Sequence, residues 1–92
     1  KGVTKNKVNS ELKKYYKNER FVKISIPDTF LSTNDVINTN NCIISVCNSK
    51  YKSKLIILSV IDNLIKGGSG QAVQNMNIRC KFSESEGLNG KI

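Results

Sequence analysis

The sequence contains no histidine and no tryptophan, and only one proline and six glycines among 92 residues. Histidine is the side chain that most often transfers protons or binds metals near neutral pH. The small number of glycines and prolines excludes collagen-like and low-complexity classes. Any chemistry that requires an imidazole must therefore use a residue outside this sequence.

Cysteine is scarce and occurs in an odd number, at Cys42, Cys47 and Cys80. An odd number gives no complete disulfide framework. Cys42 and Cys47 would lie on opposite faces of a strand, and neither a histidine nor a second pair is present to complete a zinc site. We expect no metal site and interpret all three as reduced, apolar side chains of a cytoplasmic protein.

Long apolar runs are also missing. No stretch approaches the ~18 apolar residues of a membrane span, and no signal-peptide core is present, so we expect no membrane partner. Domains usually have ~100–200 residues, so this length indicates one small domain or a piece of a larger one. Because the sequence begins with Lys1, we expect its N-terminus to be processed or truncated.

The net charge is +8, and residues 1–23 carry eight basic and two acidic side chains. Clustered cations can neutralise phosphates, so one alternative is a small basic α/β module that binds RNA. Lysines greatly outnumber arginines, and few aromatic residues are available for base stacking. We therefore favour a solvated helix face and expect no nucleic-acid partner. Titrations with RNA at two salt concentrations would separate the two.

Hydrophobic periodicity predicts a helix, a strand and a hairpin. Val8, Leu12, Tyr15 and Tyr16 form one helical stripe, with Asn9 or Ser10 as the N-cap. The remaining segments are a half-buried strand over 21–26 that ends at Pro27, an ordered loop over 28–41 tethered by Phe30, Leu31, Val36 and Ile37, and strands over 42–47 and 55–61 joined as an antiparallel hairpin.

The strand over 55–61 is apolar at both odd and even positions, a pattern typical of strands that are buried on both faces. A chain of this length offers little structure to cover a sheet from two sides. We therefore expect a partner chain or further sequence to complete the burial.

A glycine-rich segment follows this strand. Ile65, Ala72, Val73 and Met76 share one face of a predicted helix, and residues 67–70 read Gly-Gly-Ser-Gly. Glycines at a helix start allow close approach of a phosphate, a carboxylate or a flat polar ring. The spacing matches neither common nucleotide-binding fingerprint, so a tight packing turn is an equally good interpretation.

Residues 61–77 closely resemble the near-C-terminal signature of N-acetyl-gamma-glutamyl-phosphate reductases, a DNLxKGAxGQAVQNMN run. Upstream, residues 15–24 resemble the family's YY…EPFVRV stretch and residues 33–42 its TKxVxGSN segment. Downstream, residues 82–88 resemble F-x-E-T-x-G-L. Arg20 replaces a usual proline, Asn38 a glycine and Gly68 an alanine.

The resemblance implies an α+β fold that forms about the last quarter of a family member. Residues 1–60 would be the C-terminal part of a mixed-sheet catalytic and dimerisation domain, with a helix, a strand and an antiparallel hairpin. Residues 61–92 would be a strand-to-helix segment that packs on a Rossmann-type NADP-binding domain absent from this sequence. The complete protein would be a homo-oligomer.

The implied activity is NADPH-dependent reduction of N-acetyl-glutamyl phosphate to the semialdehyde and phosphate, through a cysteine thioester, in arginine biosynthesis. In the family the nucleophilic cysteine lies in an upstream Gly-Cys-Tyr-type motif, and a histidine assists proton transfer. The sequence contains neither, so it should hold no catalytic residue and be inactive alone.

The resemblance also implies cofactor-binding residues. Asn63 occupies the position whose amide often contacts the nicotinamide carboxamide in related dehydrogenases, and Gly67 and Gly68 would let the helix start lie close to that ring. Asn63 as a helix N-cap is the alternative, and both roles are compatible. Lys66 and Gln71 are weaker candidates. We expect Gln74, Asn75 and Asn77 to be helix-surface or domain-contact residues.

Overall fold

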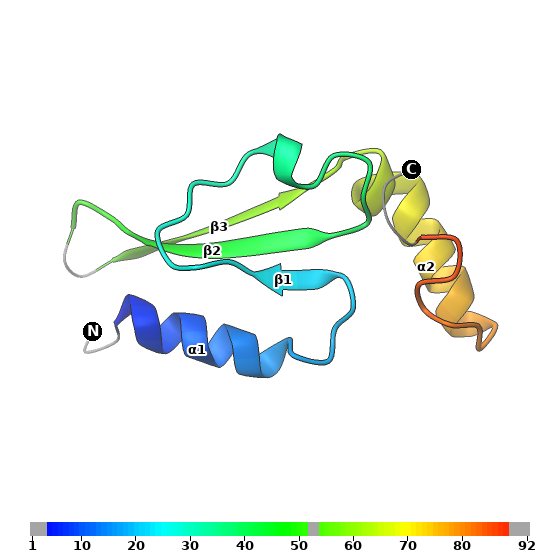
Figure 1. The fold of residues 1–92 in the computed structure, drawn as a ribbon, viewed down its shortest axis with the longest axis horizontal. Helices are drawn as coiled ribbons and strands as arrows, with labels where there is room; N and C mark the ends of the chain where they lie inside the picture. The colour runs from blue at the N-terminus through cyan, green and yellow to red at the C-terminus, as the bar shows by residue number, and fades with distance from the viewer. Residues whose placement is uncertain (1–3, 52–53, 89–92) are drawn as a thin grey trace.

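The structure is a computed structural model that describes residues 4–51 and 54–88. Its five main elements are α1 (Lys5–Tyr15), β1 (Val22–Ile24), β2 (Cys42–Asn48), β3 (Leu55–Ile61) and α2 (Gly70–Arg79). The three strands form one sheet in the order β1-β2-β3, with β1 parallel and β3 antiparallel to β2 (Figure 1). The predicted α+β class and the antiparallel hairpin are confirmed.

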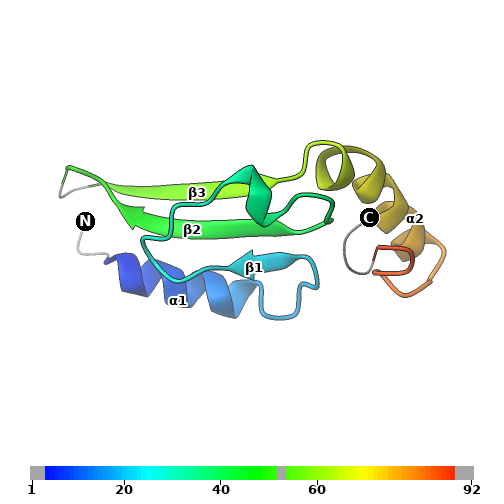
Figure 2. The ribbon, with the colours of Figure 1, turned by 45° about the horizontal axis from the view of Figure 1, so that its top comes forward.

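Different segments cover the two faces of the sheet. Helix α1 packs on one face, against β1 and β2, where Val46 is fully buried (Figure 2). On the other face, Ser45 Oγ donates to the carbonyl of Thr29 over 2.8 Å, so the loop after β1 crosses the middle of β2. Cys42 and Cys47 pair with Ile61 and Ile56 and lie on opposite faces, as the alternation predicts.

Helix α1 begins earlier than the sequence suggests. Its N-cap is Thr4, whose hydroxyl accepts the backbone N–H of Lys7 at 3.1 Å. Asn9 therefore lies within the helix, where its buried amide donates to the carbonyl of Ser25 over 3.0 Å. The prediction of Asn9 or Ser10 as the cap is wrong because Thr4 supplies the acceptor one turn earlier. Tyr15, predicted to share the buried stripe, is exposed.

Strand β1 has only three residues, because Pro27 has no N–H to continue the regular ladder, and the N–H of Asp28 donates to the Val46 carbonyl instead, over 2.9 Å. The N–H of Ser25 still bonds to the carbonyl of Ile44, but Ile26 is exposed. Asp28 then adopts a left-handed conformation with φ of 68°, and its carboxylate accepts from Asn48 N–H and the Lys5 ammonium. Hydrogen bonding to Lys5, then to Asn48, lowers the pKa of Asp28.

The loop over 28–41 is ordered, as predicted, and contains a short 3₁₀ turn at Thr33–Asp35. Of its four predicted apolar tethers, Val36 is fully buried and Leu31 is half-buried. Phe30 and Ile37 are exposed, so their apolar character did not predict burial within this chain.

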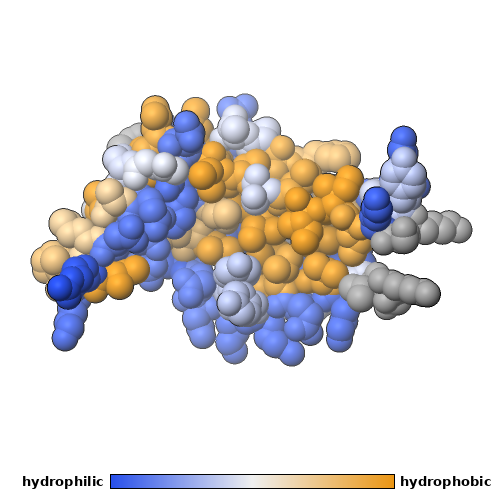
Figure 3. All heavy atoms as spheres, turned by 180° about the vertical axis from the view of Figure 1, so that it is seen from behind, coloured by the Kyte–Doolittle hydropathy of each residue, from blue (hydrophilic) through white to orange (hydrophobic). Residues whose placement is uncertain are grey.

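Strand β3 remains only partly covered. Ile56, Ile57 and Ile61 are exposed, with Ile57 at 58%. Figure 3 shows a continuous hydrophobic area on the face opposite that of Figure 1. The described residues thus provide less cover than a strand apolar on both faces requires, which agrees with the expectation from its sequence.

Helix α2 extends beyond the end of the sheet (Figure 1). It follows β3 through a π-type turn at Ile65–Ser69, in which Gly68 leaves the helical region at φ −145° and ψ −110°. The molecule is consequently elongated, measuring 45 × 24 × 16 Å. The turn between sheet and helix is the place where the sequence predicts cofactor contacts.

Candidate functional site

Asp62 organises the turn that leaves β3. One carboxylate oxygen accepts the backbone N–H groups of Leu64 and Ile65 at 2.9 and 3.2 Å, and the other accepts Asn38 N–H at 2.8 Å. These bonds close the start of the turn and attach it to the loop before β2. Asp62 thus satisfies the backbone donors that the capping alternative assigned to Asn63.

Because these three N–H groups stabilise its charged form, the pKa of Asp62 is lowered, with Asn38 making the largest contribution. A depressed folded pKa contributes stability above the unfolded value of ~3.9, and this contribution is lost as the pH falls through the folded pKa. We expect the urea midpoint of the chain to change little between about pH 7 and 5 and to fall below about pH 4. Asp62→Asn should weaken this acid dependence, whereas Glu11→Gln, on exposed α1 surface, should leave it unchanged. If the urea midpoint of Asp62→Asn fell below about pH 4 as much as that of the unsubstituted chain, Asp62 would not be the source of the acid dependence.

Asn63 lies exposed in the turn that follows β3. Its side chain is exposed and forms no hydrogen bond to residues 4–51 or 54–88. A Cβ placed on Gly67 would lie 3.3 Å from Asn63 Oδ1 and 3.2 Å from Ile61 Cδ1. Because Gly67 has no Cβ, the Asn63 amide has enough space beside it. An amide that both donates and accepts is suited to a flat polar group such as a carboxamide.

The glycine turn offers few free backbone donors. The N–H groups of Gly67, Ser69 and Gly70 donate to the carbonyls of Asp62, Leu64 and Ile65. Gly67 and Gly68 are exposed and leave open surface beside Asn63. Since the amides of Gly67 and Ser69 are already used, side-chain recognition through Asn63 is better supported here than an anion site of backbone N–H groups.

Gly70 is the glycine that packing requires. It is buried at the first position of α2, and an added Cβ would lie 2.4 Å from Asn40 Oδ1 and 2.6 Å from the carbonyl oxygen of Ile65. Asn40 itself is buried, and its Oδ1 has no hydrogen-bond partner among the described residues. The close approach of Gly70 thus brings α2 against the loop that precedes β2.

Helix α2 buries polar side chains that the sequence placed on its surface. Gln74 and Asn77 are 8% and 1% exposed, whereas Met76 of the predicted apolar face is 50% exposed. Asn77 Nδ2 donates to the carbonyls of Glu84 and Glu86 over 3.0 and 2.9 Å, which holds the following loop on the helix. The helix-surface alternative for Gln74 and Asn77 is wrong because both side chains bond to a loop that periodicity does not describe, and the domain-contact alternative stays a prediction. Asn75 is exposed, as predicted, and accepts from Gln71.

The Lys66 side chain points from the turn toward α2 and the start of β1. Its ammonium donates to Gln74 Oε1 over 2.5 Å and lies 5.4 Å from the centroid of the buried Phe21 ring. Burial lowers the pKa of Lys66, and the neighbouring Cys42 and Glu84 oppose that shift. Lys66 therefore connects the turn to helix α2 and to the residue before β1, and does not point into open space.

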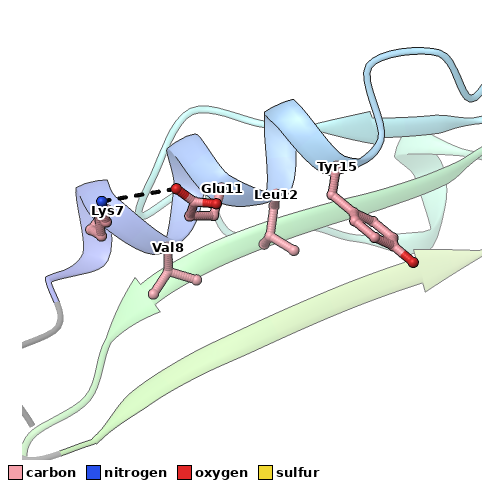
Figure 4. A pocket seen from close by; sticks show the side chains of 5 residues that line it. All are labelled: Lys7, Val8, Glu11, Leu12 and Tyr15. Carbon is pink, nitrogen blue, oxygen red and sulfur yellow. Dashed lines mark ion pairs between the residues drawn. The ribbon is translucent and has the colours of Figure 1, made fainter.

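A second surface feature lies on the α1 side of the sheet. An open groove of about 490 Å³ is lined by Lys7, Val8, Glu11, Leu12 and Tyr15. Figure 4 shows their side chains along the edge of α1, with those of Val8, Leu12 and Tyr15 directed toward β2 and β3. Lys7 and Glu11 form an ion pair of 3.9 Å at its rim. The groove belongs to the same partly covered apolar face as β3.

Comparison with known proteins identifies the family. Residues 1–63 match the family described as semialdehyde dehydrogenase, dimerisation domain. The chain belongs to this family. It is also similar to proteins named N-acetyl-gamma-glutamyl-phosphate reductase, with 58% identity over 82% of the chain in Karelsulcia muelleri and 47% over 95% in Prochlorococcus marinus. A chloroplastic protein of Oryza sativa, named as a probable reductase of the same kind, is 42% identical.

The chain spans about a quarter of the length of these relatives, 22% and 25% for the two bacterial proteins. The resemblance to N-acetyl-gamma-glutamyl-phosphate reductases is confirmed. The family match ends at Asn63, and the glycine turn and α2 follow it. The division at residues 60 and 61 stays a prediction.

Around the turn after β3, the structure brings together some predicted site residues and separates others. Asn63 and Gly67 are in close proximity, and Gly68 lies against the Asn63 carbonyl. Lys66 and Gln71 point elsewhere, toward Gln74 and Asn75. Reasoning from sequence missed Asn40 and Glu84, which meet Gln74 from distant segments. Gly70 was the one local signal of this contact. The sequence showed it as part of the glycine run but did not distinguish its packing role from the roles of Gly67 and Gly68.

Membrane-spanning helices and metal clusters are both absent from the described ranges 4–51 and 54–88. None of their helices is both long and apolar enough to cross a bilayer. No set of three or more cysteine, aspartate or glutamate side chains in these ranges is arranged to hold a metal ion. The three cysteines are free thiols, with Cys47 buried, Cys42 half-buried and Cys80 exposed.

Proposed function

We propose that this chain is the C-terminal part of an NADPH-dependent N-acetyl-gamma-glutamyl-phosphate reductase of arginine biosynthesis. The complete enzyme would convert N-acetyl-glutamyl phosphate to N-acetyl-glutamate semialdehyde and phosphate. The support is the family match over residues 1–63, together with relatives of that name that align with 82% and 95% of the chain. The segment's own role in this proposal is to bind and orient the cofactor.

The observation that carries this role is the exposed Asn63 amide beside Gly67, which has no hydrogen-bond partner among residues 4–51 and 54–88. Its exposed carboxamide can donate one hydrogen bond to, and accept one from, the carboxamide of a nicotinamide. Gly67 has no Cβ that would displace Asn63 Oδ1, which would lie only 3.3 Å away. Gly68 leaves the adjacent surface open for the ring. NADPH supplies the hydride when bound, and these residues would fix the orientation in which it is delivered.

The nucleophile and the proton-transfer group are proposed to lie in the part of the reductase that this chain does not span. The sequence has no histidine. Cys42 and Cys47 are strand residues of β2, and Cys80 follows α2, so none of the three belongs to the turn that carries Asn63. The segment alone would then be inactive. The complete protein is proposed to act in the cytoplasm as a homo-oligomer, consistent with the family's description as a dimerisation domain.

The test is Asn63→Ala in the complete enzyme. Loss of two neutral hydrogen bonds, each worth ~0.5–1.5 kcal/mol, should raise the KM for NADPH about 10-fold. Steady-state assays of NADPH oxidation with N-acetyl-glutamyl phosphate measure the effect. Asn75→Ala, on the exposed side of α2, serves as the matched control and should leave both substrates' KM values unchanged. An unaltered NADPH KM in Asn63→Ala would refute the nicotinamide role, and absence of any reduction of the acyl phosphate by the unsubstituted enzyme would refute the proposed reaction.

A further inference from the structure

Gln74 lies between two ions of opposite charge. Its Oε1 accepts from the Lys66 ammonium, and its Nε2 donates to Glu84 Oε2, each over 2.5 Å. Lys66 can only donate and an ionised Glu84 can only accept, so the two ions determine which way the Gln74 amide points. The side chain is buried, and charge-assisted bonds are stronger than neutral ones. Gln74 is therefore held in one orientation.

Gln74 also bonds to a second segment, the loop before β2. Asn40 Nδ2 donates to the same Gln74 Oε1 over 2.9 Å, although the two residues are 34 positions apart. Gln74 thus accepts from the loop before β2 and from the turn after β3, and donates to the loop after α2. One buried amide connects all three segments beside the close approach of Gly70 to Asn40.

The turn depends on this connection because Asn63 has no anchor of its own. The Asn63 amide makes no hydrogen bond to the described residues, so its direction follows from the backbone over 62–68. Asp62 holds the first end of that backbone through Asn38. Lys66 holds the second end through Gln74 and through its contact with Phe21.

We propose that Gln74 is a positioning residue for NADPH, because its hydrogen bond with Lys66 fixes the turn from which Asn63 reaches the nicotinamide. This inference rests on the proposed function. Gln74 touches neither cofactor nor substrate. It acts through Lys66 on the direction of an amide, and displacements of ~1 Å at such groups are sufficient to lower activity substantially.

The test compares two changes in the complete enzyme. Gln74→Leu keeps a side chain of similar size but removes the acceptor for Lys66 and Asn40. The double variant Gln74→Glu/Glu84→Gln exchanges the carboxylate and the amide, so position 74 again accepts from Lys66 and position 84 can donate to it. We expect Gln74→Leu to raise the KM for NADPH about 10-fold, with kcat and the KM for N-acetyl-glutamyl phosphate within about 2-fold of wild type. The double variant should return the NADPH KM to within about 2-fold. Asn75→Asp, exposed on the same helix, is the control.

Several outcomes would overturn the positioning role. One is an NADPH KM that Gln74→Leu leaves unchanged. Another is a KM for NADPH that rises as much in the double variant as in Gln74→Leu. A third is a parallel loss of melting temperature, kcat and both KM values, which would indicate a structural role alone. If Asn63→Ala itself has no effect on NADPH, the nicotinamide role fails and this inference falls with it. If Asn63→Ala weakens NADPH binding and Gln74→Leu does not, only the positioning role fails.

Discussion

Gly70→Ala is expected to destabilise this segment by about 3 kcal/mol, near the upper end of the usual cost of overpacking. The added methyl group would lie 2.4 Å from Asn40 Oδ1, 2.6 Å from the Ile65 carbonyl oxygen and 2.7 Å from Ile65 Cγ2. The Ile65 carbonyl is backbone that accepts the Gly70 N–H, so it cannot move without breaking the bond that closes the π-type turn. The roughly 1 kcal/mol by which alanine favours a helix over glycine offsets only part of this cost.

The measurement is urea unfolding of the purified protein, monitored by circular dichroism. Gly67→Ala is the matched comparison, because its added Cβ would meet only the ends of two side chains, at 3.2 and 3.3 Å. We expect Gly67→Ala to change stability by less than about 1 kcal/mol, since both neighbours can rotate away. It should instead displace the Asn63 amide and weaken NADPH binding. Equal stability of the two variants would show that α2 does not approach Asn40 as closely as described.

Asn77→Ala is expected to cost about 2–3 kcal/mol and to release the loop that follows α2. Asn77 is 1% exposed, and its amide donates to two backbone carbonyls, those of Glu84 and Glu86. Removing the amide leaves both acceptors without this donor, and alanine also leaves unfilled space under the loop. The loop includes Leu88, which is buried. Release of the loop would remove Leu88 from its packed position.

Hydrogen exchange and limited proteolysis over residues 80–88 measure this release directly. Asn77→Ala should increase exchange at these amides more than at those of β2, because the hydrogen bonds of the sheet remain. Asn75→Ala is the control, since Asn75 is exposed and its side chain accepts from Gln71 in the same helix. Unchanged exchange over 80–88 in Asn77→Ala would argue against Asn77 as the anchor of the loop.

The regular elements could largely be predicted because their signals are local. Two apolar runs indicated β2 and β3, and the polar residues between them indicated the hairpin. The positions of element ends were less predictable. The hydroxyl of Thr4 starts α1 before its apolar stripe begins. The regular ladder of β1 ends at Ile24 because Pro27 has no N–H to continue it.

The candidate site could be predicted only in part. The Asn63 and Gly67 positions came from a short contiguous motif, which needs no knowledge of distant contacts. Gln74 was predicted to be a helix-surface or domain-contact residue, and polar residues are usually exposed. Burial of Gln74 depends on Lys66, Glu84 and Asn40 meeting its amide from three directions. Such compensation of a buried polar group is invisible in the pattern of one helix.

The sequence alone determined the α+β elements, the family resemblance and the location of the glycine turn, because periodicity and contiguous motifs are written along the chain. The tertiary structure decided which glycine is sterically required and which polar side chains are buried. Gly70 and Gln74 have these roles because folding brings Asn40 from before β2 and Glu84 from beyond α2 to the same place. Steric fit and hydrogen-bond satisfaction are properties of such meetings between distant residues, so they arise only when the chain is folded.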